Sequence, residues 1–236
     1  MKRLYLLVEG QTEETFVREL LTPHYAHLDL FISPIIVRTS PGYKCGVTGY
    51  GKTKSQLKRL CRQDSGASVS TIFDLYGLPR DFPGRSDAAF PVQGSGRQKA
   101  SFLEAKLARD IDEPNFFPHL VVHEFEALLF AEPHRFGGWT DSPTVVTELA
   151  AIAKAHHTPE DINDSPVSAP SRRILQLMPD YQKTFHGPLI AAEIGLVALR
   201  GACPHFNEWL PNLKCWLLSV IDPGPSPTSL GVWPSR

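Results

Sequence analysis

The sequence predicts an α/β protein with a parallel β-sheet flanked by helices and a C-terminal helical extension. Two short segments, Leu4–Val8 and Ser68–Phe73, each run into a carboxylate and then a glycine turn. Runs of this kind are typical of strands that are covered on both faces, as in a parallel sheet. Apolar residues between and after them recur at helical spacing, which predicts the covering helices.

The first strand delivers Glu9 and Gly10 into the turn before a helix. We expect Thr12 to be the N-cap of that helix, with acidic residues in its first turn. Side chains at the carboxyl ends of strands in open α/β sheets point into the ligand crevice, so Glu9 is placed where a metal or substrate would bind. A plain surface-loop glutamate is an equally good interpretation of this stretch alone.

The next elements are a helix that ends near Pro23 and a strand at Leu28–Val37. Pro34 within that strand indicates an edge position or a bend. Residues 40 to 54 hold four glycines and three lysines, which fits either a phosphate-cradling loop or a solvated loop. The order GxxxxGK[ST] is absent, so we favour the solvated loop. A helix from Thr53 to about Arg62 follows.

The second strand-acid-glycine unit places Asp74 directly after Ser68–Phe73. Two parallel strands that each carry an acid at the carboxyl end bring both acids to one edge of the sheet. Mg²⁺ takes oxygen ligands and usually only one or two carboxylates, so this arrangement suits a divalent cation. The alternative is that Asp74 only caps its loop.

A third group of ionisable residues follows the predicted strand Leu120–Val122. His123, Glu124 and Glu126 stand among large apolar residues. Charged groups in such surroundings are costly unless they are paired or bind a metal. Burial raises the pKa of a carboxyl group, whereas a bound cation keeps it ionised. We therefore favour a functional over a structural role for this segment.

The composition changes beyond Pro133, and the remaining segments are predicted to be helical. Ser171 is the expected N-cap of a helix whose first turn holds Arg172 and Arg173, a combination that suits an anion but is also found on solvated surfaces. The tail from Asp222 is rich in proline and is expected to be disordered. The predicted division is an α/β domain at 1–135, a helical extension packed on it at 136–221, and the tail at 222–236.

The composition is that of an ordinary soluble globular protein, with 42% hydrophobic and 21% charged residues. The net charge of −1 gives no global basic field, so a polyanionic partner would need a local patch or a bound cation. Cys45, Cys61, Cys203 and Cys215 show no CxxC spacing, which argues against a zinc site. The N-terminus does not read as a signal peptide, and no apolar run approaches the ~20 residues of a membrane span. We expect a cytoplasmic protein without a membrane partner.

Four segments together resemble the Toprim-like proteins of domain-of-unknown-function family 4276. They are residues 8–13, residues 73–77, residues 123–130 and residues 169–174. The resemblance covers roughly residues 3 to 215. That family looks like a branch of the Toprim superfamily, which includes topoisomerase and primase domains, ribonuclease M5-type nucleases and the overcoming-lysogenization-defect nucleases. The resemblance implies a small parallel sheet between helices, with a glutamate and aspartates that bind Mg²⁺.

Residue by residue, the resemblance gives Glu9 the role of the Toprim glutamate, a metal ligand or general acid/base. Asp74 matches the first aspartate of the Toprim DxD motif, and Tyr76 stands where the second would be. Glu124 or Glu126 would then have to supply the missing ligand. The departure puts a two-metal mechanism in doubt and leaves a one-metal mechanism open.

The leading hypothesis is a Mg²⁺- or Mn²⁺-dependent phosphodiesterase, a nuclease acting on DNA or RNA. Glu9, Asp74, Glu124 and Glu126 are the predicted metal ligands. Glu9 also counts among the catalytic residues, together with His123 as a proton shuttle. The wider group often stands beside ATPases in phage defence, which implies a possible partner ATPase.

We expect Arg172 and Arg173 to bind phosphate oxygens. Lys183 is expected to do the same and is counted with the catalytic residues. A basic stripe would favour the nuclease; its expected members are Lys44, Lys52, Lys54, Lys58, Arg59, Arg172 and Arg173. The alternative hypothesis is a non-catalytic Toprim-like scaffold or sensor that binds a partner protein. A weaker third option is a phosphotransferase or nucleotide hydrolase that uses the glycine-rich loop at 42 to 51.

Overall fold

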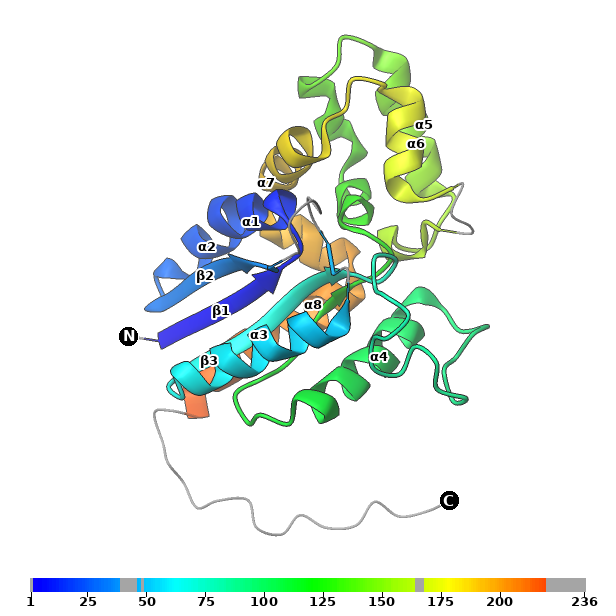
Figure 1. Cartoon of the computed structure of the whole chain (residues 1–236). Coiled ribbons are helices and arrows are strands. Elements are labelled where there is room, and N and C mark those ends of the chain that lie inside the picture. The colour runs from blue at the N-terminus through cyan, green and yellow to red at the C-terminus, as the bar shows by residue number, and fades with distance from the viewer. Residues whose placement is uncertain (1, 39–45, 48, 164–167, 220–236) are drawn as a thin grey trace, which may run out of the picture.

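In a computed structural model of the chain, four parallel strands form one sheet. The structure describes residues 2–38, 46–47, 49–163 and 168–219, of which 212–219 as backbone only. The strands are β1 (Lys2–Val8), β2 (Leu30–Ile36), β3 (Ala67–Asp74) and β4 (Leu120–Val121), in the order β2-β1-β3-β4. Helices flank the sheet and continue beyond it (Figure 1). The predicted fold class is therefore confirmed.

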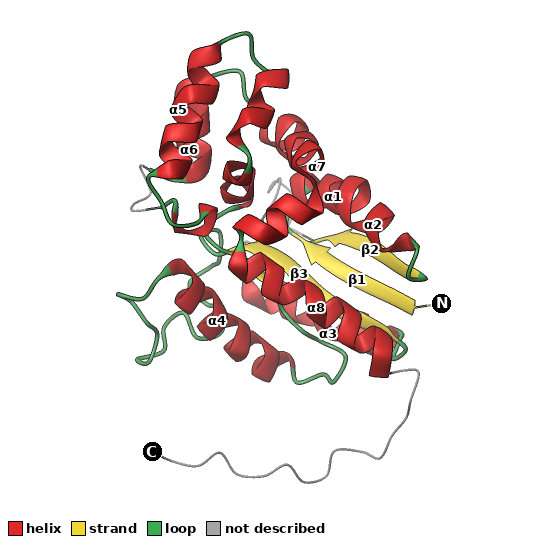
Figure 2. Cartoon of the chain, turned by 180° about the vertical axis from the view of Figure 1, so that it is seen from behind, coloured by secondary structure: helices red, strands yellow, loops and turns green. Residues whose placement is uncertain are grey.

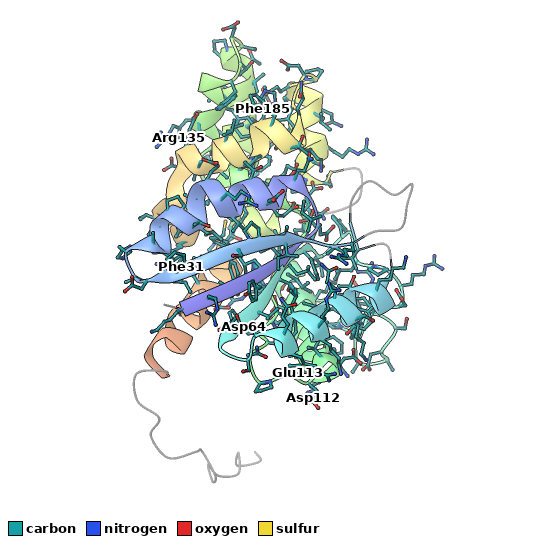
Figure 3. All side chains as sticks on the ribbon, turned by 60° about the vertical axis from the view of Figure 1, so that its left-hand side comes forward. Phe31, Asp64, Asp112, Glu113, Arg135 and Phe185 are labelled. Atoms are coloured by element: carbon teal, nitrogen blue, oxygen red, sulfur yellow. The ribbon has the colours of Figure 1, made fainter. Side chains whose placement is uncertain are left out.

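The register of the sheet brings the strand ends to a common edge. Val8 pairs with Ile36 on one side and with Ile72 on the other, and Asp74 pairs with Val121. Glu9, Asp74 and the segment after β4 thus leave the sheet at the same side. The predicted edge position of the proline-containing strand is confirmed, since β2 is the outermost strand; its Phe31 is 52% exposed (Figure 3).

The helices of the chain vary widely in length. They are α1 (Gln11–Phe16), α2 (Thr22–Ala26), α3 (Tyr50–Gln63), α4 (Gly96–Ile111), α5 (Pro143–Lys154), α6 (Pro170–Leu177), α7 (Lys183–Ala202) and α8 (Pro204–Ser219). A π-helical turn joins α1 to α2, and short 3₁₀ helices cover 125–131, 133–138 and 159–161.

The inner strands β1 and β3 are largely buried on both faces because helices cover each face. On one face Leu4, Leu6 and Val8 of β1 belong to a core that also takes side chains from α1, α7 and α8. On the other face Leu7 joins a second core with Val69 of β3 and side chains of α3 and α4. The alternation along β1 follows from the period of two in a strand. Figure 2 shows the sheet from behind, between its two helix layers.

The first core runs on into the helical extension. It includes Val145 and Leu149 of α5 and Ile174 of α6 as well as residues of the sheet. In Figure 1 these two helices stand away from the sheet, at the top. We retain the boundary between residues 135 and 136 as a proposal about domain organisation, and the predicted tail at 222–236 lies outside the described residues.

Three local predictions are wrong in detail. The N-cap of α1 is Gly10 rather than Thr12, and Glu13 accepts a hydrogen bond from the Gly10 N–H at 2.9 Å. The first helical stretch does not end at Pro23, because a proline fits the first turn of the following α2. The N-cap of α6 is Ala169, so Ser171 lies within the helix and its hydroxyl is used elsewhere.

The last two helices form a sharp bend. Within the described residues, no single helix has both the length and the apolar composition needed to cross a membrane. Only α7 and the first part of α8 together reach that length and composition, and they are bent by 94° relative to each other. The start of α8 is held by Glu160, whose two carboxylate oxygens accept the backbone N–H groups of His205 and Phe206, each at 2.9 Å. A carboxylate at this position also complements the helix dipole.

Replacing Glu160 with alanine is expected to destabilise the fold. The change leaves two backbone N–H groups without their acceptor in a buried setting, which costs about 1–3 kcal/mol per group left unsatisfied. Chemical denaturation followed by circular dichroism measures the loss. Glu148→Ala, a matched change at an exposed position of α5, should alter the free energy of unfolding by less than about 0.5 kcal/mol. Equal stability of the two variants would contradict the role given to Glu160.

Candidate metal centre at the carboxyl edge of the sheet

Glu9 leaves β1 with one carboxylate oxygen fixed and the other open. Its Oε1 accepts the backbone N–H of Asp74 at 2.8 Å, which ties the ends of β1 and β3 together. A Cβ at Gly77 would come within 3.3 Å of Oε2, and one at Gly46 within 3.5 Å. Glycine at these positions keeps the surroundings of Oε2 clear. Burial, and then the charge of Glu13, raises the pKa of Glu9 to about 8, although the Asp74 N–H opposes the shift.

Asp74 is the centre of the electrostatic field at this edge. Its Oδ1 accepts the backbone N–H of Phe125 at 2.9 Å, which links the end of β3 to the segment after β4. Burial raises its pKa well above the ordinary value. Four further carboxylates add to the shift, namely Glu9, Glu13, Glu126 and Glu124 in falling order. We call these five residues, Glu9, Glu13, Asp74, Glu124 and Glu126, the acid cluster.

Glu126 and Lys183 form the ion pair of the acid cluster. The Lys183 Nζ lies 3.2 Å from Glu126 Oε2 and 3.5 Å from Glu124 Oε2, with 45% of its side chain exposed. Burial raises the pKa of Glu126 to about 7 against the opposing charge of Lys183. Burial would lower the pKa of Lys183, but the carboxylates of Glu126 and Glu124 outweigh it and raise the pKa. The other oxygen of Glu126, Oε1, is buried without a hydrogen-bond partner among the described residues.

Glu124 is engaged at the N-terminus of α6. Its Oε1 accepts the Ser171 N–H at 2.5 Å, and its Oε2 accepts the Ser171 hydroxyl at 3.0 Å. The predicted anion site at this helix end therefore already holds an anion from the chain itself. Arg173 Nε donates to the Ser168 carbonyl at 2.7 Å, and Arg172 is exposed. The two arginines follow Ser171, which donates to Glu124 of the acid cluster, while their assignment to phosphate stays a prediction.

His123 links the sheet edge to the 158–163 segment. It adopts a left-handed backbone conformation, with φ of +67°, and its Nδ1 lies 3.1 Å from the Asn163 amide nitrogen. Burial lowers its pKa, partly offset by the Glu160 backbone. The ring of Tyr76 lies 5.7 Å from that of His123 and is 41% exposed. These contacts favour a positioning role for His123.

A basic hollow lies beside α3 and includes Arg38, two residues after the end of β2. It has a volume of about 370 Å³ and is lined by Arg38, Gly51, Lys52, Ser55, Gln56 and Arg59. Of the stripe expected from sequence, Lys52 and Arg59 thus share one hollow, whereas Lys54 pairs with Asp110 at 2.9 Å. Lys44 lies outside the described residues, as does half of the glycine-rich loop at 42 to 51.

Two contributors to this edge escaped the sequence analysis, Glu13 as an acid of the cluster and Arg38 in the hollow. Glu13 had a detectable signal, because an acid at the third helical position often accepts the N-cap N–H. Arg38 follows the predicted edge strand, so its arrival at the same edge as Glu9 follows from parallel pairing. Neither was distinguishable from an ordinary surface charge without the fold.

The acid cluster fits a hard divalent cation. It offers carboxylate oxygens, the ligand type that Mg²⁺ and Mn²⁺ prefer, and one of them is buried without a partner. The raised pKa values of Glu9, Asp74 and Glu126 show that burial above all, together with the charge of neighbouring carboxylates, disfavours their ionised forms. The acid cluster is an open arrangement, in which no three ligand atoms of its described residues lie within 4.8 Å of one another. Within the part of the chain that the structure describes, only a separate group at Glu104 meets that distance. Mg²⁺ usually keeps several of its waters, which suits an open arrangement.

A family model matches residues 8–214, and the chain therefore belongs to the family described as Domain of unknown function (DUF4276). No curated protein matches the chain. Among solved structures, the C-terminal region of the Burkholderia pseudomallei OLD protein is 16% identical, with a TM-score of 0.42 over 90% of this chain and 98% of that one. The corresponding region from Xanthomonas campestris pv. campestris is 15% identical, with a TM-score of 0.38 over 91% and 98%. At such TM-scores neither structure says what this chain does.

Glu9→Gln is expected to stabilise the metal-free protein at alkaline pH. The pKa of Glu9 lies at about 8 in the folded chain against an ordinary 4.5, so the folded state binds more protons between these values. The free energy of unfolding of the wild type therefore falls as pH rises from about 4.5 to 8. Glutamine keeps the acceptor for the Asp74 N–H and removes the titration, so the variant should gain about 1–3 kcal/mol at pH 8 and less at pH 5.

Urea denaturation in the presence of a chelator, repeated at both pH values, measures this difference. Glu14→Gln is the matched control on α1, since it loses only a surface ion pair with Arg18 worth about 0.3–0.5 kcal/mol. Added Mg²⁺ should reduce the difference in free energy of unfolding between Glu9→Gln and the wild type, because it stabilises the wild type more than the variant. Identical stability of wild type and Glu9→Gln at pH 8 would show that Glu9 does not resist ionisation.

Proposed function

We propose that the chain is a Mg²⁺- or Mn²⁺-dependent phosphodiesterase, and more specifically a nuclease. The observation that carries this proposal is the acid cluster, in which five carboxylates from separate segments meet at the carboxyl edge of a parallel sheet. Ligands of open α/β sheets bind at this edge. The resemblance to Toprim-like proteins supports the same chemistry through Glu9 and Asp74.

Glu9, Asp74 and Glu126 are the residues we assign to the cation. Glu9 and Glu126 each have an oxygen that is not held by a hydrogen bond within the described residues, and Asp74 lies between their charges. A bound divalent cation would polarise the phosphate and lower the pKa of a water molecule. Glu124 is left to fix the N-terminus of α6, so the supporting acid from the segment after β4 is Glu126 rather than Glu124.

The remaining residues of the edge act on protons and charge. Glu9 has a pKa near the working pH before the cation binds, and its open Oε2 is placed to take or return a proton. Lys183 stays protonated and presents a half-exposed ammonium group next to the carboxylates, where it would stabilise negative charge on a phosphate. His123 keeps the 158–163 segment and the Tyr76 ring in place.

A nucleic acid is the substrate that we favour. The net charge of −1 provides no long-range attraction, but the basic hollow supplies a local one beside the sheet edge. Tyr76 is exposed at the same edge and offers an aromatic ring to an unpaired base. By the family resemblance we extend the proposal to a partner ATPase, to a role in phage defence or nucleic-acid processing, and to a cytoplasmic location.

Metal-dependent cleavage should be lost on single isosteric changes in the acid cluster. The purified chain is incubated with single- and double-stranded DNA and RNA in Mn²⁺ or Mg²⁺, and the products are resolved by electrophoresis. Glu9→Gln, Asp74→Asn and Glu126→Gln should each lower the rate at least about 100-fold, because each removes a metal ligand. Glu14→Gln should keep the wild-type rate.

Calorimetric titration with Mn²⁺ is run on the same variants. Binding by the wild type that both Glu9→Gln and Asp74→Asn lose would support the assigned ligands. Cleavage that persists in Asp74→Asn would exclude this site as the active centre. If the wild type neither binds the cation nor cleaves any of the four substrates, the proposal fails and the scaffold or sensor hypothesis takes its place.

The basic hollow should set the salt dependence of binding. Arg59→Gln and Arg38→Gln each remove one cation from the hollow, so each should weaken nucleic-acid binding and lower the slope of log K against log salt by about 1 if it contacts a phosphate. Fluorescence anisotropy with labelled oligonucleotides at several salt concentrations measures the slope. Arg62→Gln, a change on the same helix that loses a pair with Glu113, is the matched control. If Arg62→Gln alters the salt slope as much as Arg59→Gln does, the nucleic acid does not bind specifically at the basic hollow.

A further inference from the structure

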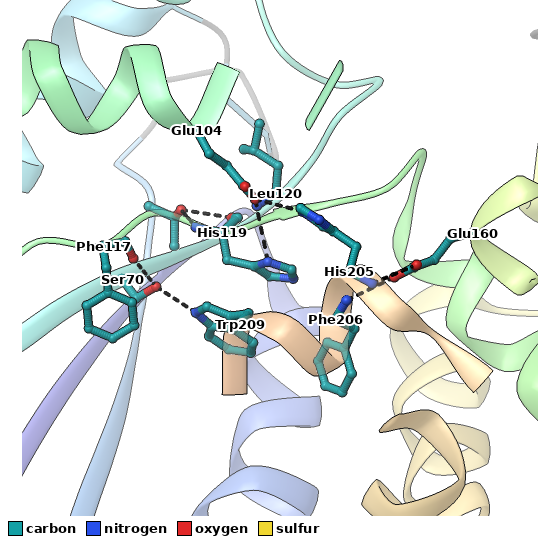
Figure 4. A network of polar contacts seen from close by, with 10 residues as sticks. Ser70, Glu104, Phe117, His119, Leu120, Glu160, His205, Phe206 and Trp209 are labelled. Atoms are coloured by element: carbon teal, nitrogen blue, oxygen red, sulfur yellow. Dashed lines mark hydrogen bonds and ion pairs between the residues drawn. The ribbon is translucent and has the colours of Figure 1, made fainter. Parts of the chain in front are cut away.

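A second polar group lies between α4, β4 and α8, apart from the acid cluster. Glu104 of α4, His119 at the start of β4 and His205 in the first turn of α8 point toward one another (Figure 4). His205 Nε2 lies 2.9 Å from Glu104 Oε1, and His119 Nδ1 lies 3.6 Å from the same atom. One ligand atom from each residue falls within 4.8 Å of the other two. Residues far apart in sequence thus bring two imidazoles and a carboxylate together.

His119 lacks a good hydrogen bond on either ring nitrogen. It is only 2% exposed, its Nδ1 is too far from Glu104 for a good hydrogen bond, and its Nε2 has no partner among the described residues. Glu104 Oε1 already accepts the Leu120 N–H at 2.7 Å and faces His205 Nε2. A buried polar group without partners costs about 1–3 kcal/mol. A cation shared with Glu104 and His205 would give the Nδ1 of His119 a partner.

The spacing of the three groups fits a tetrahedral metal. Zn²⁺ binds histidine nitrogen and carboxylate oxygen at about 2.0–2.2 Å, so neighbouring ligands in a tetrahedral shell lie roughly 3.3 Å apart. The two distances to Glu104 Oε1, 2.9 Å and 3.6 Å, bracket that value, and the two imidazole ligand atoms lie within 4.8 Å of each other. Two imidazoles with one carboxylate favour zinc or a similar transition metal over Mg²⁺, which prefers oxygen ligands.

The surroundings hold the group in place and leave room for a fourth ligand. The ring of His119 stacks between those of His205 and Trp209, with centroids 5.2 Å and 4.5 Å away. The Trp209 Nε1–H donates to Ser70 Oγ at 3.0 Å, which anchors the stack to β3. A cavity of about 130 Å³ adjoins the group and is lined in part by Ser101 and Glu208. A water molecule fits in such a space.

We propose that Glu104, His119 and His205 form a site for Zn²⁺ or a similar transition-metal ion, independent of the acid cluster. A metal bound there would join α4, the residue before β4 and the start of α8. The site would stabilise the C-terminal helix against the sheet, as structural zinc does elsewhere. The cysteine spacing, which argued against zinc, gives no information on a site built from histidine and glutamate.

The test is a titration of the full chain, freed of metal by a chelator, with Zn²⁺ and with Co²⁺ in excess Mg²⁺. The Mg²⁺ occupies the oxygen ligands of the acid cluster and leaves nitrogen ligands to the probe. We expect one equivalent of Zn²⁺ by calorimetry, visible ligand-field bands from Co²⁺, and quenching of Trp209 fluorescence by Co²⁺ because its ring stacks on His119. Glu104→Gln and His119→Gln should each weaken Zn²⁺ binding at least about 10-fold.

Two controls separate this site from others. Glu104→Gln retains an acceptor for the Leu120 N–H, so its thermal stability with chelator should match the wild type while its gain on adding Zn²⁺ is lost. His27→Gln removes an exposed histidine of the α1–α2 region and should bind Zn²⁺ normally. No Zn²⁺ binding by the wild type, or binding that Glu104→Gln and His119→Gln leave unchanged, would overturn the proposal. Zn²⁺ binding that Glu9→Gln abolishes would overturn it too, because the metal would then sit in the acid cluster.

Discussion

The burial of neighbouring carboxylates at the carboxyl edge of the sheet is the constraint around which this structure is arranged. Five acids meet there, and the charge of Lys183 acts on them from one side. Ionised carboxylates in a partly buried setting are costly unless they are hydrogen-bonded or bound to a cation. The folded chain meets this cost in two ways, with backbone donors for some oxygens and with raised pKa values for the rest.

The backbone donors explain why the edge is built from so many segments. Glu9 accepts from the end of β3, Asp74 from Phe125 after β4, and Glu13 from the Gly10 turn. Each of these three carboxylates therefore binds the backbone of another strand end, segment or turn and fixes its position. Removing one of these carboxylates would remove a candidate metal ligand and would also loosen the contact between two segments. Isosteric amides are for this reason the informative changes, because they keep the acceptor and remove the charge.

The sequence was sufficient for the sheet and for its edge. Apolar segments that end in an acid and a glycine predicted β1 and β3, and parallel pairing then placed Glu9 and Asp74 on the same side. The partners of each acid were not predictable, because they depend on packing. Glu124 and Glu126 were equivalent in sequence, yet Glu124 binds the start of α6 whereas Glu126 faces Lys183. Local signals also failed at helix ends, where Gly10 and Ala169 took the cap positions expected of Thr12 and Ser171.

The group of Glu104, His119 and His205 could not be found from a sequence motif. Its residues stand 15 and 86 positions apart, without a spacing that a sequence pattern would reveal. Glu160 holds the start of α8, where the ring of His205 stacks on that of His119 from the segment before β4. The acid cluster offers oxygen and the second group offers mainly nitrogen, so the two sites differ in the metals they prefer. A chain with both would use one ion for chemistry at the sheet edge and another to keep the C-terminal helix in the position that completes the core beneath that edge.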